Sequence, residues 1–266
     1  PDKIEGIEVT EIGEYAFKDC SSFTGALIIP DTVTIIRRGA FLNCSGFDSL
    51  VLGKSVATIA DGYNWGYNGA FQGCTGFKGD LMIPDSVAKI GVAAFDGCKG
   101  FKGLKLGNSV TVIGEAAFLD CAGFKGDLII PDSVTSIDYN AFRGCYGFNG
   151  KLEIGDEVST VGNYAFSGCY GFNAISLGKS VSEVGFHAFE GCKGLTGSLI
   201  IPDSVTSIGQ SAFNGCKGLR NLTLGNSVSS IGKEAFSGCS GLFYTDRQRA
   251  NIQGNADDRF TVFQSG

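Results

Sequence analysis

A twelve-residue pattern, I-G-x-x-A-F-x-x-C-x-G-F, recurs along this chain and constrains its fold more than any other feature. Residues 113–124 contain one complete copy. Ten Ala-Phe pairs each precede a cysteine by three residues, and successive pairs are 23, 24 or 30 residues apart. A fixed period in this range predicts a solenoid, in which each repeat forms one coil and packs only on its neighbours. The pattern includes every cysteine of the chain: Cys20, Cys44, Cys74, Cys98, Cys121, Cys145, Cys169, Cys192, Cys216 and Cys239.

Each repeat divides into three short segments. In the first, typified by residues 128–130, Leu128 and Ile130 share one face of an apolar strand and point inward, while Ile129 points outward. The second segment, V-x-x-I, is rich in β-branched residues and favours extended backbone. In the third segment, Phe118 and Cys121 fit one face of a helical or 3₁₀ turn, which Gly123 should end.

These segments predict that each repeat forms one coil. The strands of successive coils should pair in parallel, with backbone hydrogen bonds running between coils. Ten coils at strand spacing give a rod about 45–50 Å long. We expect the solenoid to occupy residues 1–243, starting within a repeat, and residues 244–266 to form a C-terminal cap or tail, because the pattern stops there. The 41 glycines and 21 phenylalanines suit tight corners and a filled interior.

The charge and hydropathy of the chain exclude some partners. A net charge of −6 argues against nucleic acid and against an anionic membrane surface, both of which attract basic patches. No apolar run approaches the roughly 20 residues that a membrane-spanning helix needs, so no membrane insertion is expected in this fragment.

The cysteines are too regular for an ordinary disulfide framework. One cysteine per coil forms a row with parallel Cβ directions, which is poor geometry for disulfides. Zinc sites use paired ligands such as C-x₂-C, and none occurs. We therefore expect buried free thiols that act as small apolar residues, and no metal.

A corner position after the first strand alternates in charge along the array. Asp and Asn at turns commonly bond their own backbone, which is the simpler interpretation. A Ca²⁺-binding row of carboxylates is the alternative, although interleaved lysines and asparagines work against it. The position is occupied by Asp31, Lys54, Asp85, Asn108, Asp132, Asp156, Lys179, Asp203 and Asn226.

The 30-residue interval contains an insertion within residues 61–69. It holds Tyr63, Trp65 and Tyr67, and Trp65 is the only tryptophan of the chain. Insertions in solenoids map to surface loops that often carry function, so these aromatic residues are candidates for a sugar or peptide contact. The alternative is a loop that packs its aromatic rings on the adjacent coil.

Signals for catalysis are nearly absent. The single histidine, His187, has no evident partner, and no nucleotide-binding, nucleophile-elbow or metalloprotease motif occurs. We expect no catalytic residues, no cofactor and no enzymatic activity.

Sequence variation concentrates on the outward positions of the first strand. Such a variable row above a constant core is what a binding solenoid presents, and exposed apolar residues there predict a macromolecular contact. A plain preference of these positions for β-formers is the alternative. The candidate ligand-binding residues are Ile28, Val51, Met82, Lys105, Ile129 and Glu153, together with Tyr63, Trp65 and Tyr67 of the insertion.

The repeat unit C-x-G-F/L-x-x-x-L-x-I-P-D-S-V-x-x-I-G-x-x-A-F resembles the BspA-like, or treponemal-type, leucine-rich repeats of bacterial surface proteins. Residues 199–209 fit that pattern closely, whereas Phe replaces Leu after the glycine in seven units. The resemblance implies a right-handed leucine-rich-repeat superhelix on the bacterial surface or outside the cell. It also implies adhesion to host or matrix proteins or to other cells. We expect the partner on the strand face to be a host or matrix protein, or a glycan. A structural spacer and a polysaccharide-active β-solenoid enzyme are the competing functions.

Overall fold

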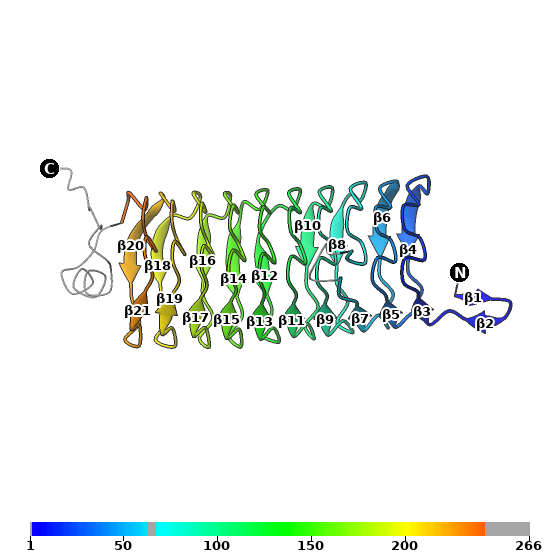
Figure 1. Ribbon diagram of the computed structural model, residues 1–266, viewed down its shortest axis with the longest axis horizontal. Helices are drawn as coiled ribbons and strands as arrows, with labels where there is room; N and C mark the ends of the chain where they lie inside the picture. The colour runs from blue at the N-terminus through cyan, green and yellow to red at the C-terminus, as the bar shows by residue number, and fades with distance from the viewer. Residues whose placement is uncertain (1, 63–67, 243–266) are drawn as a thin grey trace.

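The computed structural model describes residues 2–62 and 68–242, and within these ranges it contains strands and turns but no helix. The coils stack side by side along one axis, with two columns of strands (Figure 1). The solenoid predicted from the repeat is thus confirmed. At the N-terminal end, β1 (Lys3–Ile4) and β2 (Ile7–Glu8) form an antiparallel hairpin that precedes the stack.

One column of strands is a continuous parallel sheet built from the V-x-x-I segments. Each strand has two residues, and the Ile or Val at its second position is buried in every coil after the first. The ten strands are β3 (Glu11–Ile12), β5 (Ile35–Ile36), β7 (Thr58–Ile59), β9 (Lys89–Ile90), β11 (Val112–Ile113), β13 (Ser136–Ile137), β15 (Thr160–Val161), β17 (Glu183–Val184), β19 (Ser207–Ile208) and β21 (Ser230–Ile231).

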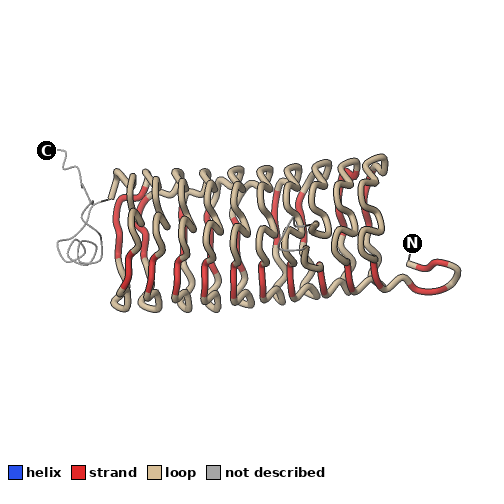
Figure 2. Tube along the Cα trace, viewed as in Figure 1, coloured by secondary structure: helices blue, strands red, loops and turns tan. Residues whose placement is uncertain are grey.

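Figure 2 shows the strands of both columns as red segments. The other column is interrupted and is not one continuous sheet. It divides into the sheets β4-β6, β8-β10, β12-β14-β16 and β18-β20, all with parallel pairing. Leu128 and Ile130 are buried and Ile129 is exposed, as predicted. The strands are β4 (Gly25–Ile28), β6 (Phe47–Val51), β8 (Asp80–Met82), β10 (Gly103–Lys105), β12 (Leu128–Ile130), β14 (Lys151–Ile154), β16 (Ala174–Ser176), β18 (Gly197–Ile200) and β20 (Leu219–Thr223).

Each interruption occurs where a shorter coil is followed by a longer one. Leu104 lies three residues after Phe101, but Leu128 lies four residues after Phe124, so the longer coil has one extra residue before its strand. A glycine with positive φ precedes or begins the strand of each longer coil that starts a new sheet. A glycine with positive φ changes the direction of the backbone, as glycines do at β-bulges. These glycines are Gly25, Gly79, Gly126 and Gly197.

Two rows of aromatic rings fill the interior. In the first, which contains the Phe of every Ala-Phe pair, neighbouring ring centroids lie 5.0–5.5 Å apart with planes within 13°. The second row begins at Phe23 and runs to Phe172, and Leu195, Leu219 and Leu242 continue it. Because the core is a stack of like residues, its stability depends on nearest-neighbour contacts.

The A-F-x-x-C segment is a series of tight turns, which corrects the expected helical or 3₁₀ turn. The N–H groups of Ala117 and Leu119 donate to carbonyls three residues earlier, at 3.1 and 3.0 Å. The intervening N–H groups of Ala116, Phe118 and Asp120 donate to carbonyls of the next coil at 2.8 Å. A helix would direct every N–H along its own axis, whereas here half of them join coils.

This alternation requires left-handed backbone at two positions in most coils. One precedes the Ala-Phe pair, as in Ala116 with φ +53°, and the other precedes the cysteine, as in Asp120 with φ +54°. Left-handed backbone costs a non-glycine residue about 1–2 kcal/mol. The first position nevertheless holds residues such as Ala116, Tyr164 and His187, whereas the second position is occupied only by Gly, Asp and Asn. Its residues are Asp19, Asn43, Gly73, Gly97, Asp120, Gly144, Gly168, Gly191, Gly215 and Gly238.

The glycine two residues after the cysteine is required for a different reason from the one predicted. Gly123 does not have positive φ, so it does not end a turn through left-handed backbone. A Cβ atom on Gly123 would lie 2.1 Å from the carbonyl oxygen of Lys99 in the preceding coil. Glycine is therefore required there because adjacent coils approach closely.

The corner aspartates also differ from their predicted role, because they bond across coils and not to their own backbone. The Asp85 carboxylate accepts the backbone N–H of Asn108 at 2.7 Å, and Asp132 accepts that of Asp156 at 2.8 Å. Asp156 in turn forms an ion pair with Lys179. The adjacency of Asp132 and Asp156 is thus accommodated by a hydrogen bond.

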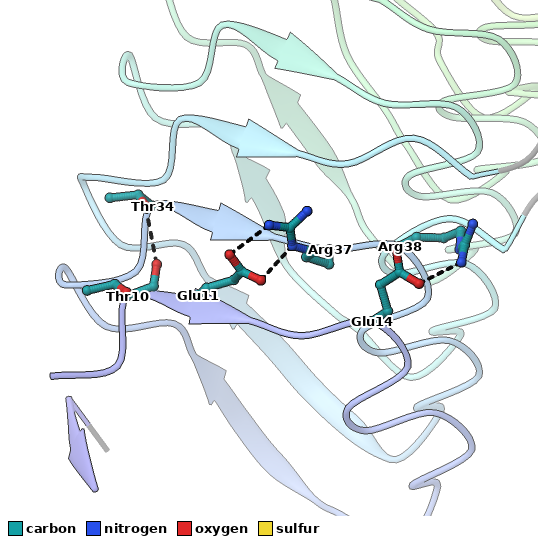
Figure 3. Close-up of polar contacts among 6 residues, drawn as sticks. All are labelled: Thr10, Glu11, Glu14, Thr34, Arg37 and Arg38. Carbon is teal, nitrogen blue, oxygen red and sulfur yellow. Dashed lines mark hydrogen bonds and ion pairs between the residues drawn. The ribbon is translucent and has the colours of Figure 1, made fainter. Parts of the chain in front are cut away.

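Side-chain contacts tie the first coil to the second (Figure 3). Arg37 donates to both carboxylate oxygens of Glu11, at 2.5 and 2.9 Å, and Arg38 donates to Glu14 at 2.6 Å. The guanidinium of Arg37 lowers the pKa of the Glu11 carboxyl below its ordinary value. A bidentate contact of this kind fixes geometry as well as charge at an otherwise half-exposed end.

Truncation of a central ring tests the stacked core. Phe118→Ala should lower the free energy of unfolding by about 3–5 kcal/mol, because the ring is fully buried and stacked on both sides. The matched variant Phe17→Ala, at 36% exposure in the first coil, should cost much less. Urea denaturation followed by circular dichroism measures both, and equal losses would contradict nearest-neighbour stacking.

Two glycines of one coil separate backbone strain from close approach. Gly168 has φ +78° with its nearest neighbours 3.8 Å from an added Cβ, so Gly168→Ala should cost about 1–2 kcal/mol. An added Cβ on Gly171 would lie 2.0 Å from the Phe148 carbonyl, so Gly171→Ala should cost more. The same urea experiment decides, and a reversed order would refute the assignment of roles.

Candidate functional site

The outward side chains of the interrupted column form the surface that the sequence singled out, and we call it the strand face. Ile28, Val51, Met82 and Ile129 are between 52 and 64% exposed, and Lys105 and Glu153 are exposed as well. Large apolar residues at such exposure contribute nothing to the core, which makes them available for contact. The strand face continues through Ser176, Ile200 and Thr223, which are also exposed.

Strand register sets the order of these side chains along the rod. Ile28 pairs with Val51, Met82 pairs with Lys105, and Ile129 pairs with Glu153. The N-terminal part of the strand face is therefore apolar over three consecutive coils. From Lys105 onward, the apolar residues Ile129 and Ile200 are separated by charged or polar ones.

A groove opens in the strand face between β10 and β12, which do not pair with each other. Lys105 and Ile129 lie on its two sides, and Asp127 and Asp132 stand on the β12 side. The Asp127 carboxylate accepts the backbone N–H of Lys151 at 2.7 Å, which fixes its position. The groove is completed by Leu104, Leu106, Asn108, Ile130, Pro131 and Ser133.

The groove combines apolar surface with charges of both signs. Lys105 forms no ion pair with any residue in the described ranges, so its ammonium group is available to an external acceptor. Such a mixed surface suits a protein partner, since interfaces combine apolar anchors with polar rims.

The insertion residues Tyr63, Trp65 and Tyr67 lie outside the described residues. Their contact with a sugar or peptide stays a prediction.

The cysteines are free thiols, as predicted, and all except the half-buried Cys20 are buried. Each buried thiol donates a hydrogen bond to the phenylalanine carbonyl of the preceding coil, for example Cys121 to Phe95 at 3.0 Å. Burial raises the pKa of Cys44 to about 11 and that of Cys192 to about 12. Since the thiolate is the nucleophile, these thiols are poor candidates for covalent chemistry.

The single histidine has partners that the sequence did not reveal. His187 Nδ1 lies 3.0 Å from a carboxylate oxygen of Glu190, and its ring stacks on Tyr164 with centroids 4.7 Å apart. Within the ranges that the structure describes, no group of three or more His, Cys, Asp or Glu is arranged to hold a metal ion. No helix among these residues is long and apolar enough to cross a membrane.

A second variable row was missed because it lies inside the I-G-x-x motif, which looks like core filler. The third residue of the motif follows a glycine in most coils, and Asp138 in the coil of Tyr139, and it changes from one coil to the next. Comparing this position across repeats would have found it, since it holds aromatic, amide and charged residues that are exposed or half-exposed. Its members include Glu115, Tyr139, Asn163 and Phe186.

Comparison with known proteins places these features in a family. A model of the BspA type leucine-rich repeat region, with six copies, matches residues 10–149, 67–196 and 150–253, which together span most of the chain. The chain belongs to the BspA-type leucine-rich repeat family. The family resemblance inferred from the repeat is confirmed, and this family is one of repeat proteins. None of the curated proteins searched matches the chain.

Several solved structures are similar to the chain, and the first two described here have the same fold. A leucine-rich repeat protein from Bacteroides ovatus is 27% identical with a TM-score of 0.65, over 88% of this chain and 69% of that protein. A leucine-rich repeat protein from Eubacterium ventriosum is 21% identical with a TM-score of 0.61, over 89% of this chain and 63% of that protein. A leucine-rich cell surface protein from Faecalibacterium prausnitzii is 22% identical with a TM-score of 0.43, over 92% of this chain and 86% of that protein.

The raised thiol pKa values predict a loss of stability in alkali. An unfolded thiol ionises near pH 8.5, whereas Cys192 stays protonated to about pH 12 when folded. Its contribution is therefore complete below about pH 8.5 and is lost as the pH rises toward 12. Relative to Cys192→Ala, the wild-type free energy of unfolding should fall by about 1.4 kcal/mol more per pH unit above pH 9.

Urea unfolding of both proteins from pH 7 to pH 10 measures this difference. If the gap between the two proteins did not change with pH, the thiol would not be excluded from solvent as described.

Proposed function

We propose that this chain is a non-enzymatic recognition module at the bacterial cell surface that binds a protein partner through its strand face. The proposal is supported chiefly by the exposed apolar residues Ile28, Val51, Met82 and Ile129, which lie on one face of a folded array. Their side chains add nothing to the packed interior. Membership of the BspA-type family supports surface localisation and a recognition role.

The partner should combine apolar side chains with acidic and basic groups. Ile28, Val51 and Met82 offer an apolar contact along three coils, and Lys105 offers a cation beside the groove. Asp127 and Asp132 add fixed carboxylates about one coil away. A host or matrix protein has surfaces of this mixed kind, and binding would be weakened by charge placed within the apolar part.

Charge substitution on the strand face tests this function. Met82→Lys and Ile129→Lys should each reduce retention on an array of matrix and host-surface proteins at least tenfold, because a buried unpaired ammonium opposes contact. Both side chains are exposed, so the thermal unfolding midpoint should not change. Ser230→Lys, exposed on the continuous sheet, is the matched control and should bind as the wild type does.

Unaltered binding by both strand-face variants would refute the placement of the site. Failure of the wild-type chain to bind any protein of the array would instead favour a structural spacer.

A further inference from the structure

A trough runs beside the continuous sheet, on a surface that is separate from the strand face. Its floor contains Gly162 and Gly185, where the repeated I-G motif leaves no side chain. The glycines are required by packing, since an added Cβ would lie 2.7 Å from the Ile137 carbonyl oxygen at Gly162 and 2.6 Å from Asn163 Oδ1 at Gly185. The solenoid thus produces a hollow as a by-product of close coil stacking. We call it the glycine trough.

One wall of the trough presents aromatic surface. Tyr139 lines it and is 42% exposed. Phe186 is not part of the lining, but it directly follows the lining residue Gly185, two coils from Tyr139, and is 54% exposed. Two coil spacings separate these rings by about 10 Å. Between them, Asn163 accepts the backbone N–H of Phe186 at 2.8 Å, which fixes its amide.

The ring of Tyr139 is held in place by its neighbours. Tyr164 stacks on His187 of the next coil, with planes 4° apart, so the Tyr164 ring face is directed along the rod. Tyr139 meets Tyr164 at 84° with centroids 5.8 Å apart. That perpendicular contact helps to orient Tyr139, and the 42% of the residue that stays exposed offers ring surface to a ligand.

The remaining lining is rich in hydrogen-bond acceptors. Glu115, Asp138 and Glu183 contribute carboxylates, and Thr160 contributes a hydroxyl. Ionised carboxylates accept hydrogen bonds only, and they form strong bonds to hydroxyl donors. The lining includes no Lys or Arg. An anionic ligand would therefore be repelled.

We infer that the glycine trough binds a neutral oligosaccharide. A sugar ring has an apolar C–H face that can lie on Tyr139 and a rim of hydroxyl donors that match the carboxylates. Tyr139 in the lining and Phe186 beside the lining residue Gly185 are two coils apart, so the two rings do not enclose one point as a cage for a cationic side chain would. Their separation is about the length of a disaccharide, so a linear chain can contact both. The hollow floor lets it approach the backbone.

Glycan binding by the full 266-residue chain tests this inference. An array of neutral, sialylated and sulfated oligosaccharides should retain the protein on neutral members only, and titration calorimetry with a retained neutral hexasaccharide should give a measurable affinity. Tyr139→Ala and Phe186→Ala should each lower that affinity at least tenfold without changing the thermal unfolding midpoint.

The control is Tyr146→Ala, an exposed ring that belongs neither to the lining nor to the motif position shared by Tyr139 and Phe186, and it should bind as the wild type does. Absence of binding to every neutral glycan would overturn the inference, as would full affinity in Tyr139→Ala. Binding of an arginine-rich peptide in place of glycans would also overturn it. Met82→Lys should leave glycan binding intact, which separates this site from the strand face.

Discussion

Hydrogen bonding between coils is the constraint on which the rest of this structure depends. The two-residue strands of the continuous sheet are too short to be stable alone, and alternate N–H groups of each A-F-x-x-C segment also point to the next coil. Even the corner aspartates and the buried thiols bond across coils, as Asp85 and Cys121 do. Each coil therefore serves as the template for its neighbour, and the stacked phenylalanines occupy the space that this spacing leaves.

The repeated residues of the motif follow from that close approach. Gly123 leaves room for a neighbouring carbonyl, Cys121 fills a small apolar site while donating to one, and Asp120 tolerates left-handed backbone. Most substitutions at these positions would break contacts between coils or strain the backbone. The recognition that we propose therefore uses positions whose side chains leave the stack, on the strand face and along the glycine trough.

Periodicity was sufficient to predict the solenoid, the coil boundaries, the inward residues such as Leu128 and the free thiols. Periodicity could not reveal which backbone groups bond across coils. A tight turn and a close approach between coils can both require a glycine, so the sequence does not distinguish them. Gly123 is required because adjacent coils approach closely, whereas Gly168 is favoured because its backbone is left-handed. The exposed residues of the strand face were predicted from their alternation, whereas the groove beside Lys105 arises from a one-residue difference in coil length. Tyr139 was missed because it sits within a motif that otherwise fills the core.

The unequal columns of strands also make the rod mechanically anisotropic. On the side of the continuous sheet, every two neighbouring coils are joined by paired strands. A bend that separates two coils there must therefore break strand pairing, wherever along the array it occurs. On the opposite side, the boundaries between β6 and β8, β10 and β12, and β16 and β18 carry no strand pairing. Flexure should therefore concentrate at these three joints, dividing the rod into stiff segments of two or three coils that hinge about a common spine.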